Sequence, residues 1–97
     1  MRKIPVIRSS RADQDLIEIW SYVAKDNPNA ADRLLRRLDD RIQRLQDYPE
    51  QGESLPNSNI GMRRVVEGSY LIFYQILDDV IRVVRVLHTS RQWEDVL

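Results

Sequence analysis

The sequence predicts an α+β fold in which a helical hairpin packs on one face of a mainly antiparallel four-stranded sheet. Two neighbouring segments, residues 12–24 and 31–45, place apolar residues at helical period. One short β-branched segment precedes them, and three β-rich segments follow between residues 62 and 87. The expected element order is therefore β-α-α-β-β-β, and we expect residues 1–97 to form a single domain.

The first expected strand, Lys3–Arg8, is short and rich in β-branched residues. Pro5 cannot donate a hydrogen bond to a neighbouring strand, so we expect this strand at an edge of the sheet. Ser9 and Ser10 supply hydroxyl groups that can cap a helix. Asp13 follows Ser10 by three residues, which predicts a capping box with aspartate in place of glutamate.

Each expected helix carries a single apolar stripe. The first stripe consists of Ala12, Leu16, Ile19, Trp20, Val23 and Ala24, and the second of Ala31, Leu34, Leu35, Leu38, Ile42 and Leu45. Asn27-Pro28 ends the first helix and begins the second, because asparagine caps a helix and proline is favoured in its first turn. Tyr48-Pro49 ends the second helix, so the pair forms an αα-hairpin.

Residues 49–60 contain two prolines, a glycine and several small polar residues, and we expect a loop there. The strands that follow are expected at Met62–Glu67, Tyr70–Leu77 and Val80–Leu87. The two-residue breaks between them are short enough for tight hairpins. The tail, Ser90–Leu97, forms either a short helix or a segment that lies on the sheet.

The composition narrows the class of protein. The 97-residue chain is 42% hydrophobic and 31% charged, which is typical of a globular domain. It contains no cysteine, which excludes disulfides and thiolate metal sites. No segment has the length and apolarity of a membrane span or a signal peptide, so we expect a cytoplasmic protein.

Fifteen basic and fifteen acidic residues give a net charge of zero. Proteins that bind a phosphate backbone usually carry excess positive charge, so neutrality favours a protein target. The charge is uneven along the chain, since residues 60–91 hold five arginines against three acidic residues, whereas residues 9–48 hold seven basic and eight acidic residues. We therefore expect the binding surface in the C-terminal half.

Four segments resemble, in order, the pattern of ParE-type toxins of the ParE/RelE superfamily: DLIEIWSYVA, YPEQG, GMRRVVEGSYLIFYQI and RVVRVLHTSRQW. The resemblance covers nearly the whole chain, and the final Arg-Val-Leu-His-x-x-Arg is its most specific part. It implies a RelE-like fold and a toxin of a type II toxin–antitoxin system, which inhibits growth and serves plasmid stabilization.

The resemblance also implies the partners. A ParD-like antitoxin would hold the toxin inactive in a hetero-oligomer, and the free toxin would inhibit DNA gyrase by protein contact, without enzymatic activity. The alternative is a ribosome-dependent messenger-RNA endonuclease like RelE, because the two branches share a fold. A third hypothesis is a degenerate member that binds an antitoxin and is not toxic. We expect no cofactor, no metal ion, no membrane contact and no direct binding of nucleic acid.

The candidate site residues belong to the C-terminal half. Contact with the target or the antitoxin is expected from Arg63, Arg64, Arg82, Arg85, His88, Arg91 and Trp93. In a nuclease, Arg63, Arg85 and His88 would supply the cations and the acid–base group. The tail lacks the tyrosine that several nucleases of this fold keep after His88, and no lysine follows Lys25. Both features favour protein contact over RNA cleavage.

Each of these residues also has a structural interpretation. His88 would end the last strand and hydrogen-bond locally, and an arginine would form a salt bridge with Glu67 or Asp78. Strict alternation along the last strand places two sets on opposite faces, Ile81, Val83, Arg85 and Leu87 against Arg82, Val84, Val86 and His88. Arg63 and Arg64 must also point to opposite faces, so only one of them can join a common site.

The aromatic residues have two interpretations as well. Trp20 lies on the apolar stripe, and we expect it in the core. The segment Tyr70–Tyr74 alternates like a central strand, which favours packing over a base-stacking platform. Trp93 lies in a polar tail, where it either fastens the tail to the sheet or anchors a partner.

Overall fold

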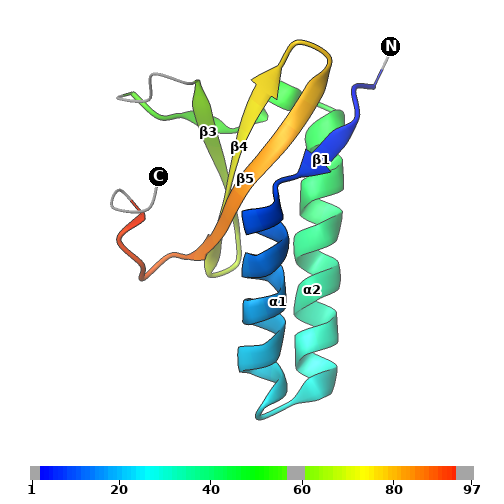
Figure 1. The fold of residues 1–97 in the computed structure, drawn as a ribbon, viewed down its shortest axis with the longest axis vertical. Coiled ribbons are helices and arrows are strands. Elements are labelled where there is room, and N and C mark those ends of the chain that lie inside the picture. Colours follow the sequence, from blue (N-terminus) through cyan, green and yellow to red (C-terminus); the bar gives the residue numbers. More distant parts are fainter. Residues whose placement is uncertain (1–2, 57–60, 94–97) are drawn as a thin grey trace.

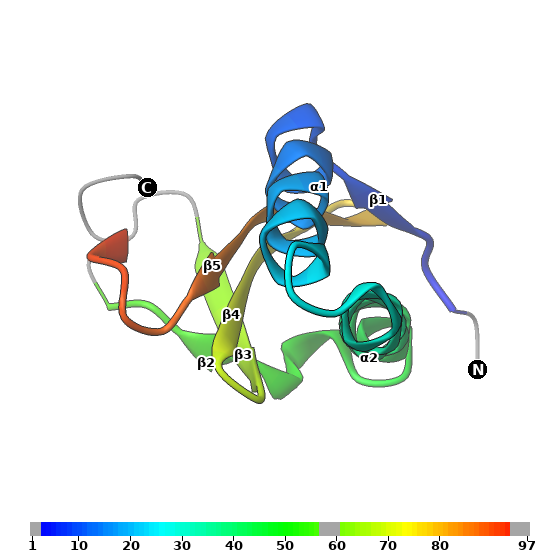
Figure 2. The ribbon, with the colours of Figure 1, turned by 90° about the horizontal axis from the view of Figure 1, so that it is seen from below.

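The computed structural model describes residues 3–56 and 61–93. A helical hairpin of α1 (Ser10–Ala24) and α2 (Pro28–Gln43) packs on one face of a five-stranded sheet (Figure 1). Residues 89–93, which follow the last strand, lie on the other side of the sheet (Figure 2). The predicted α+β class is confirmed, although the sheet has five strands where four were expected.

The sheet has the spatial order β1-β5-β4-β3-β2. Its strands are β1 (Val6–Arg8), β2 (Glu53–Ser54), β3 (Met62–Glu67), β4 (Tyr70–Leu77) and β5 (Val80–His88). β1 is shorter than expected and pairs in parallel with β5 at the predicted edge, whereas the other pairs are antiparallel. The additional strand, β2, lies in the expected loop, after two short 3-10 helices, Arg44–Gln46 and Pro49–Gln51. Residues 57–60 of that loop lie outside the described residues.

Side-chain caps define where the helices begin. Ser9 rather than Ser10 caps α1, because its hydroxyl oxygen accepts a first-turn backbone N–H at 3.0 Å. The same hydroxyl donates to a carbonyl of β5 at 2.9 Å, which fixes Ser9 in this position. The predicted capping box was therefore wrong, and Asp13 pairs instead with Arg8 at 2.8 Å. Asn27 caps α2 as predicted.

The sheet buries apolar side chains on both faces. The helix-side core consists of Ala12, Leu16, Leu38, Ile42, Leu45, Val65, Ile72, Tyr74, Ile81, Val83 and Val86. On the face away from the helices, called the open face below, lies a smaller cluster of Met62, Leu71, Phe73 and Leu87, against which Leu55, Val84 and Trp93 pack. Trp93 thus fastens the tail to the sheet. Residues 94–97 of the tail lie outside the described residues.

The prediction that side chains alternate strictly along β5 was wrong, because a β-bulge interrupts its pairing with β4. Two neighbouring residues of β4 lie opposite Val83 and Arg85, so Val84 has no partner in β4. The extra residue changes which side chains face the helices. Val86, rather than Leu87, joins Val83 in the helix-side core.

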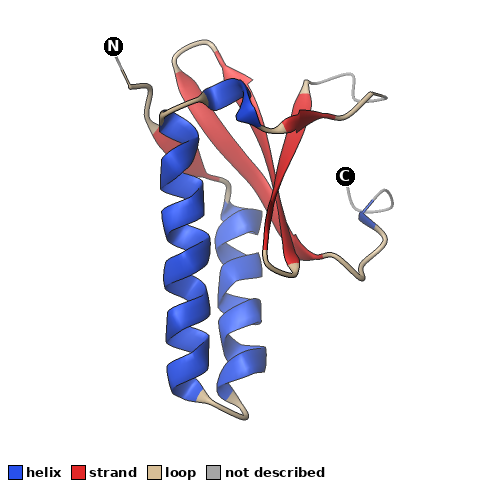
Figure 3. Cartoon of the chain, turned by 180° about the vertical axis from the view of Figure 1, so that it is seen from behind, coloured by secondary structure: helices blue, strands red, loops and turns tan. Residues whose placement is uncertain are grey.

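Trp20 was expected in the core, and this prediction was wrong, since its side chain is 36% exposed. The sheet covers one end of the helical hairpin, and the other end projects beyond it (Figure 3). Near the projecting end, the indole N–H of Trp20 donates to Asp32 at 2.8 Å and connects the helices directly. Within the described ranges, no helix is long and apolar enough to cross a membrane.

Candidate interaction site

Arg85 is withdrawn from the surface by a buried ion pair with α1. Its Nε and Nη2 donate to the two carboxylate oxygens of Asp15 at 2.7 and 3.0 Å, and the two residues are 7% and 2% exposed. The same carboxylate accepts the backbone N–H of Val86 at 3.0 Å. The hydrogen bonds with Asp15 raise the pKa of the Arg85 guanidinium, since they favour its charged form. Arg85 therefore joins α1 to β5, and its charge is used inside the protein.

Arg63 lies on the helix side of β3 and holds the loop that follows α2. Its Nη1 donates to the carbonyls of Gly52 and Glu50 at 2.8 and 3.2 Å. The neighbouring Tyr74 hydroxyl donates to the carbonyl of Pro49 at 2.7 Å and accepts the N–H of Gly52 at 2.8 Å. A Cβ at Gly52 would lie 2.5 Å from the Tyr74 hydroxyl, so this approach requires glycine. Arg63 thus has a structural role in the loop.

Replacing Tyr74 by phenylalanine tests this loop attachment. Burial raises the pKa of the Tyr74 hydroxyl, so its contribution to stability is present below tyrosine's ordinary pKa and lost as the pH rises above it. We expect Tyr74→Phe to lower the free energy of unfolding by about 1–3 kcal/mol at neutral pH, because a buried N–H and a half-buried carbonyl lose their partner. The variant should also lose less stability than the wild type above about pH 10.

Urea unfolding at neutral and alkaline pH measures both effects. Tyr48→Phe is the matched control, because the Tyr48 side chain is 71% exposed and this change should leave the stability nearly unaltered. Equal stability of Tyr74→Phe and wild type at neutral pH would contradict the proposed role of the hydroxyl.

His88 ends β5 and is exposed. Its Nδ1 accepts the backbone N–H of Ser90 at 3.1 Å and lies 2.8 Å from the Ser90 hydroxyl. The imidazole packs edge-on against the ring of Tyr70, with 5.2 Å between centroids. A neutral imidazole then carries its proton on Nε2, because Nδ1 is an acceptor. These contacts fit the local structural role that the sequence suggested for His88.

The three residues of the nuclease set do not converge. Arg63 lies opposite Tyr74 and His88 lies opposite Tyr70, and these two positions are about 13 Å apart along β4. Arg85 lies between them in the sheet, but its guanidinium binds the carboxylate on α1. The cations and the acid–base group of this set are therefore not directed at one phosphate.

Arg64 and Trp93 meet on the open face, so the two adjacent arginines point to opposite faces as predicted. The Trp93 ring packs on Phe73, with 5.3 Å between centroids. The guanidinium carbon of Arg64 lies 5.4 Å from the centroid of the Trp93 ring, which is a cation–π distance. Arg64 also pairs with Glu53 of β2 at 3.0 Å. We call Arg64, Phe73 and Trp93 the tryptophan platform.

Arg82 and Arg91 are exposed and lie near opposite ends of β5. Arg82 pairs in register with Gln75 of β4, and Arg91 lies in the turn after β5, where its N–H donates to the carbonyl of His88 at 3.0 Å. Within the described part of the chain, neither forms an ion pair. Of the predicted contact residues, Arg82, His88 and Arg91 are therefore exposed. Arg64 and Trp93 lie on the open face, in the tryptophan platform.

A groove lies between the two helices, where the helical hairpin predicts a docking surface for an antitoxin, but none of the predicted site residues lines it. Its volume is about 720 Å³, and it is lined by Arg8, Asp13, Leu16, Ile17, Trp20, Leu35, Arg36 and Asp39. Ile17 is 65% exposed, so apolar surface borders the groove. Ile17 lies outside the apolar stripe of α1. An isoleucine at such a position is a sequence signal for an exposed apolar surface.

Comparison with known proteins identifies the class. The family model for the ParE toxin of the type II toxin–antitoxin system parDE matches residues 6–93. Toxin ParE1 of Caulobacter vibrioides is 34% identical over 88 residues, with 89% of this chain and 90% of that protein covered. Toxin RelE2 of the same species is 34% identical over 86 residues, with 89% of this chain and 96% of that protein covered.

The fold has a solved relative as well. The chromosomal ParDE toxin–antitoxin system from P. aeruginosa contains a chain that superposes with a TM-score of 0.76 at 19% identity, covering 89% of this chain and 96% of that one. Fold and relatives together define a small toxin of the ParE/RelE superfamily. The chain belongs to the family of ParE toxins of type II toxin–antitoxin systems.

Proposed function

We propose that this toxin inhibits DNA gyrase by protein contact, without chemistry of its own, and that a ParD-like antitoxin holds it inactive in the cytoplasm. The observation that carries the proposal is the dispersal of the nuclease set. Arg85 pairs with a buried carboxylate, and Arg63 binds loop carbonyls. The β4 residue opposite His88 lies about 13 Å along the strand from the β4 residue opposite Arg63. The relatives do not decide the target, because ParE1 and RelE2 are equally similar.

The open face is the surface that we assign to the target. Tryptophan and arginine are enriched among the residues that dominate binding energy at protein interfaces. The tryptophan platform combines both, and its Trp93 ring is half-buried against Phe73, which fixes its orientation at little further cost in entropy. Arg82 lies on the same face and adds an exposed cation.

The groove between α1 and α2 is the surface that we assign to the antitoxin. Leu16, Ile17, Trp20 and Leu35 give it apolar walls, and charged residues complete its lining. An amphipathic helix lays its apolar face into a groove of this kind. The similarity to a chain of a ParDE system supports an antitoxin as the occupant.

Expression of the chain with and without its antitoxin tests the proposed function in cells. We expect the chain alone to arrest growth and to induce a DNA-damage reporter, because inhibited gyrase leaves broken DNA. Primer extension on an abundant transcript should show no new 5′ ends. Discrete cuts in reading frame would support the endonuclease instead. Unimpaired growth without the antitoxin would contradict toxicity itself and would indicate a degenerate member.

A further inference from the structure

Charge is divided between the two flanks of α2. On the flank that faces α1, Asp32 accepts the indole N–H of Trp20, and Asp39 pairs with Arg8 at 3.2 Å. The opposite flank carries four arginines, which recur at i, i+4, i+8 and i+11 across α2 and the turn after it and therefore share one face. They are Arg33, Arg37, Arg41 and Arg44.

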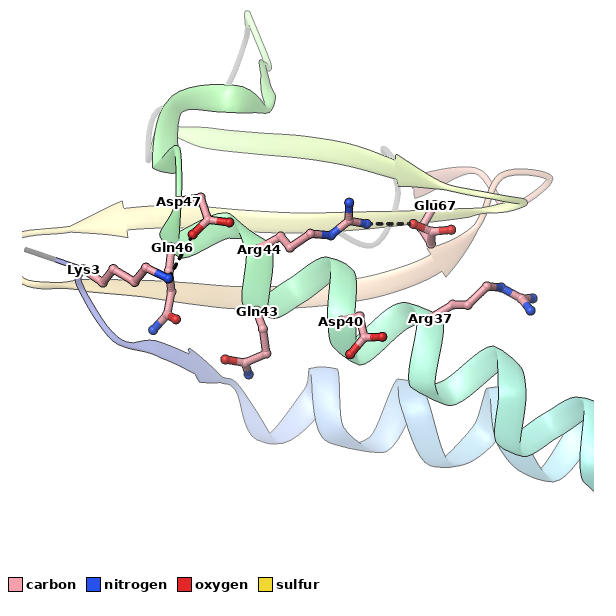
Figure 4. A pocket seen from close by; sticks show the side chains of 8 residues that line it. All are labelled: Lys3, Arg37, Asp40, Gln43, Arg44, Gln46, Asp47 and Glu67. Carbon is pink, nitrogen blue, oxygen red and sulfur yellow. Dashed lines mark ion pairs between the residues drawn. The ribbon is translucent and has the colours of Figure 1, made fainter. Parts of the chain in front are cut away.

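Most of this basic flank is not neutralised. Arg44 pairs with Glu67 at 3.7 Å. Asp40 also lies on this flank, but Figure 4 shows its carboxylate apart from the guanidinium of Arg37, and no ion pair joins them. Three arginines have no ion pair with another residue of the described ranges. These three, Arg33, Arg37 and Arg41, are called the arginine track.

Helix stability does not explain the two exposed arginines of the track, Arg33 and Arg37, although Arg41 in the last turn of α2 complements the helix dipole. Residues at i and i+4 are neighbours on a helix, so Arg37 has a like charge on either side, which is unfavourable. Acidic residues that could separate these charges are present in α2, but two of its three aspartates lie on the other flank. Two exposed arginines that oppose local stability and contribute nothing to the core point to a binding function.

We propose that the arginine track binds the phosphate backbone of duplex DNA. Its residues are spaced by about 6 Å along the helix axis, so their guanidinium groups can pair with successive phosphate oxygens. Arg33, Arg37, Asp40 and Arg44, the exposed positions of this flank, are all charged, so the flank lacks the apolar centre of a protein interface. The choice of duplex DNA as the ligand rests on the proposed function, because DNA gyrase acts on duplex DNA.

The neutral composition led to the opposite expectation. Composition counts charges but does not show where they lie. In the folded chain, the aspartates of α2 that face α1 are engaged there, and the three arginines of the track face away from them. A neutral protein can therefore present a locally basic surface to a phosphate backbone.

Salt-dependent binding of the purified full chain to a fluorescent 20-base-pair duplex tests the proposal. Three phosphate contacts predict a slope of log affinity against log salt of about −2.7, which is about a 40-fold loss of affinity between 50 and 200 mM salt. In the variant Arg33→Gln/Arg37→Gln, one contact remains, and the loss should be only about fourfold. Arg11→Gln/Lys25→Gln is the matched control, because it removes the same charge from exposed positions of the helical hairpin outside the track, and it should keep the wild-type slope.

Three results would overturn the inference. They are equal slopes for the two double variants, no binding at 50 mM salt, and a stronger salt dependence with single-stranded RNA than with the duplex. Inhibition of gyrase by the wild-type chain is measured in parallel. Inhibition without duplex binding defeats the inference alone, whereas track-dependent duplex binding without inhibition defeats the proposed function alone.

Discussion

Replacing Asp15 by alanine is expected to lower the free energy of unfolding by about 3–5 kcal/mol. The change would leave the Arg85 guanidinium charged and uncompensated, 7% exposed, and it would also remove the acceptor of the Val86 N–H. Arg85 cannot escape this penalty by deprotonation, since an arginine stays charged throughout the accessible pH range. Urea unfolding followed by circular dichroism measures the loss.

Two further variants distinguish the effect of the buried ion pair on stability from that of an exposed ion pair. Asp13→Ala removes a carboxylate that pairs with Arg8 at the surface, and it should cost less than about 1 kcal/mol. Asp15→Leu/Arg85→Met removes both buried charges, and it should recover at least about 2 kcal/mol relative to Asp15→Ala. A loss below 1 kcal/mol for Asp15→Ala would show that the pair does not hold α1 on β5.

Replacing Trp93 by alanine is expected to weaken gyrase inhibition by about 30-fold or more, because central tryptophans of interfaces contribute about 2 kcal/mol or more. The change removes the ring that lies between Phe73 and the Arg64 guanidinium, and so dismantles the platform on the open face. The concentration that halves supercoiling activity is the quantity to measure, with circular dichroism as the check on folding.

The control for this prediction is Tyr22→Ala. Tyr22 is an aromatic residue of α1, on the helix side of the molecule, and is 74% exposed. Its removal should change the inhibitory concentration less than about twofold, because side chains outside the centre of an interface contribute little to the binding energy. Equal effects of the Trp93 and Tyr22 changes would place the target surface elsewhere.

Much of the fold could be predicted because local sequence signals decide it. The apolar stripes gave both helices, and the two-residue breaks placed β3, β4 and β5 at the expected residues, except that β5 extends to His88. What failed depends on distant partners. Ser9 caps α1 because β5 holds its hydroxyl, and Trp20 is exposed because the hairpin projects beyond the sheet. Neither effect can be inferred from the residues that surround Ser9 or Trp20 in the sequence.

The candidate site was less predictable than the fold, since a side chain's role depends on what it meets in space. Arg85 finds Asp15 at a separation of 70 residues, and only the position of an acidic residue beside the apolar stripe of α1 hinted at it. Arg63 binds carbonyls of a loop that was expected to be irregular. Trp93, by contrast, fastens the tail to the sheet, which was one of its two predicted roles.

Inhibition of purified DNA gyrase by the purified chain tests the central claim most directly. We expect relaxed plasmid to remain relaxed in the presence of the chain, supercoiling to return when the antitoxin is added, and a cellular transcript incubated with ribosomes and the chain to stay intact. Undiminished supercoiling together with cleavage of the ribosome-bound transcript would contradict the account.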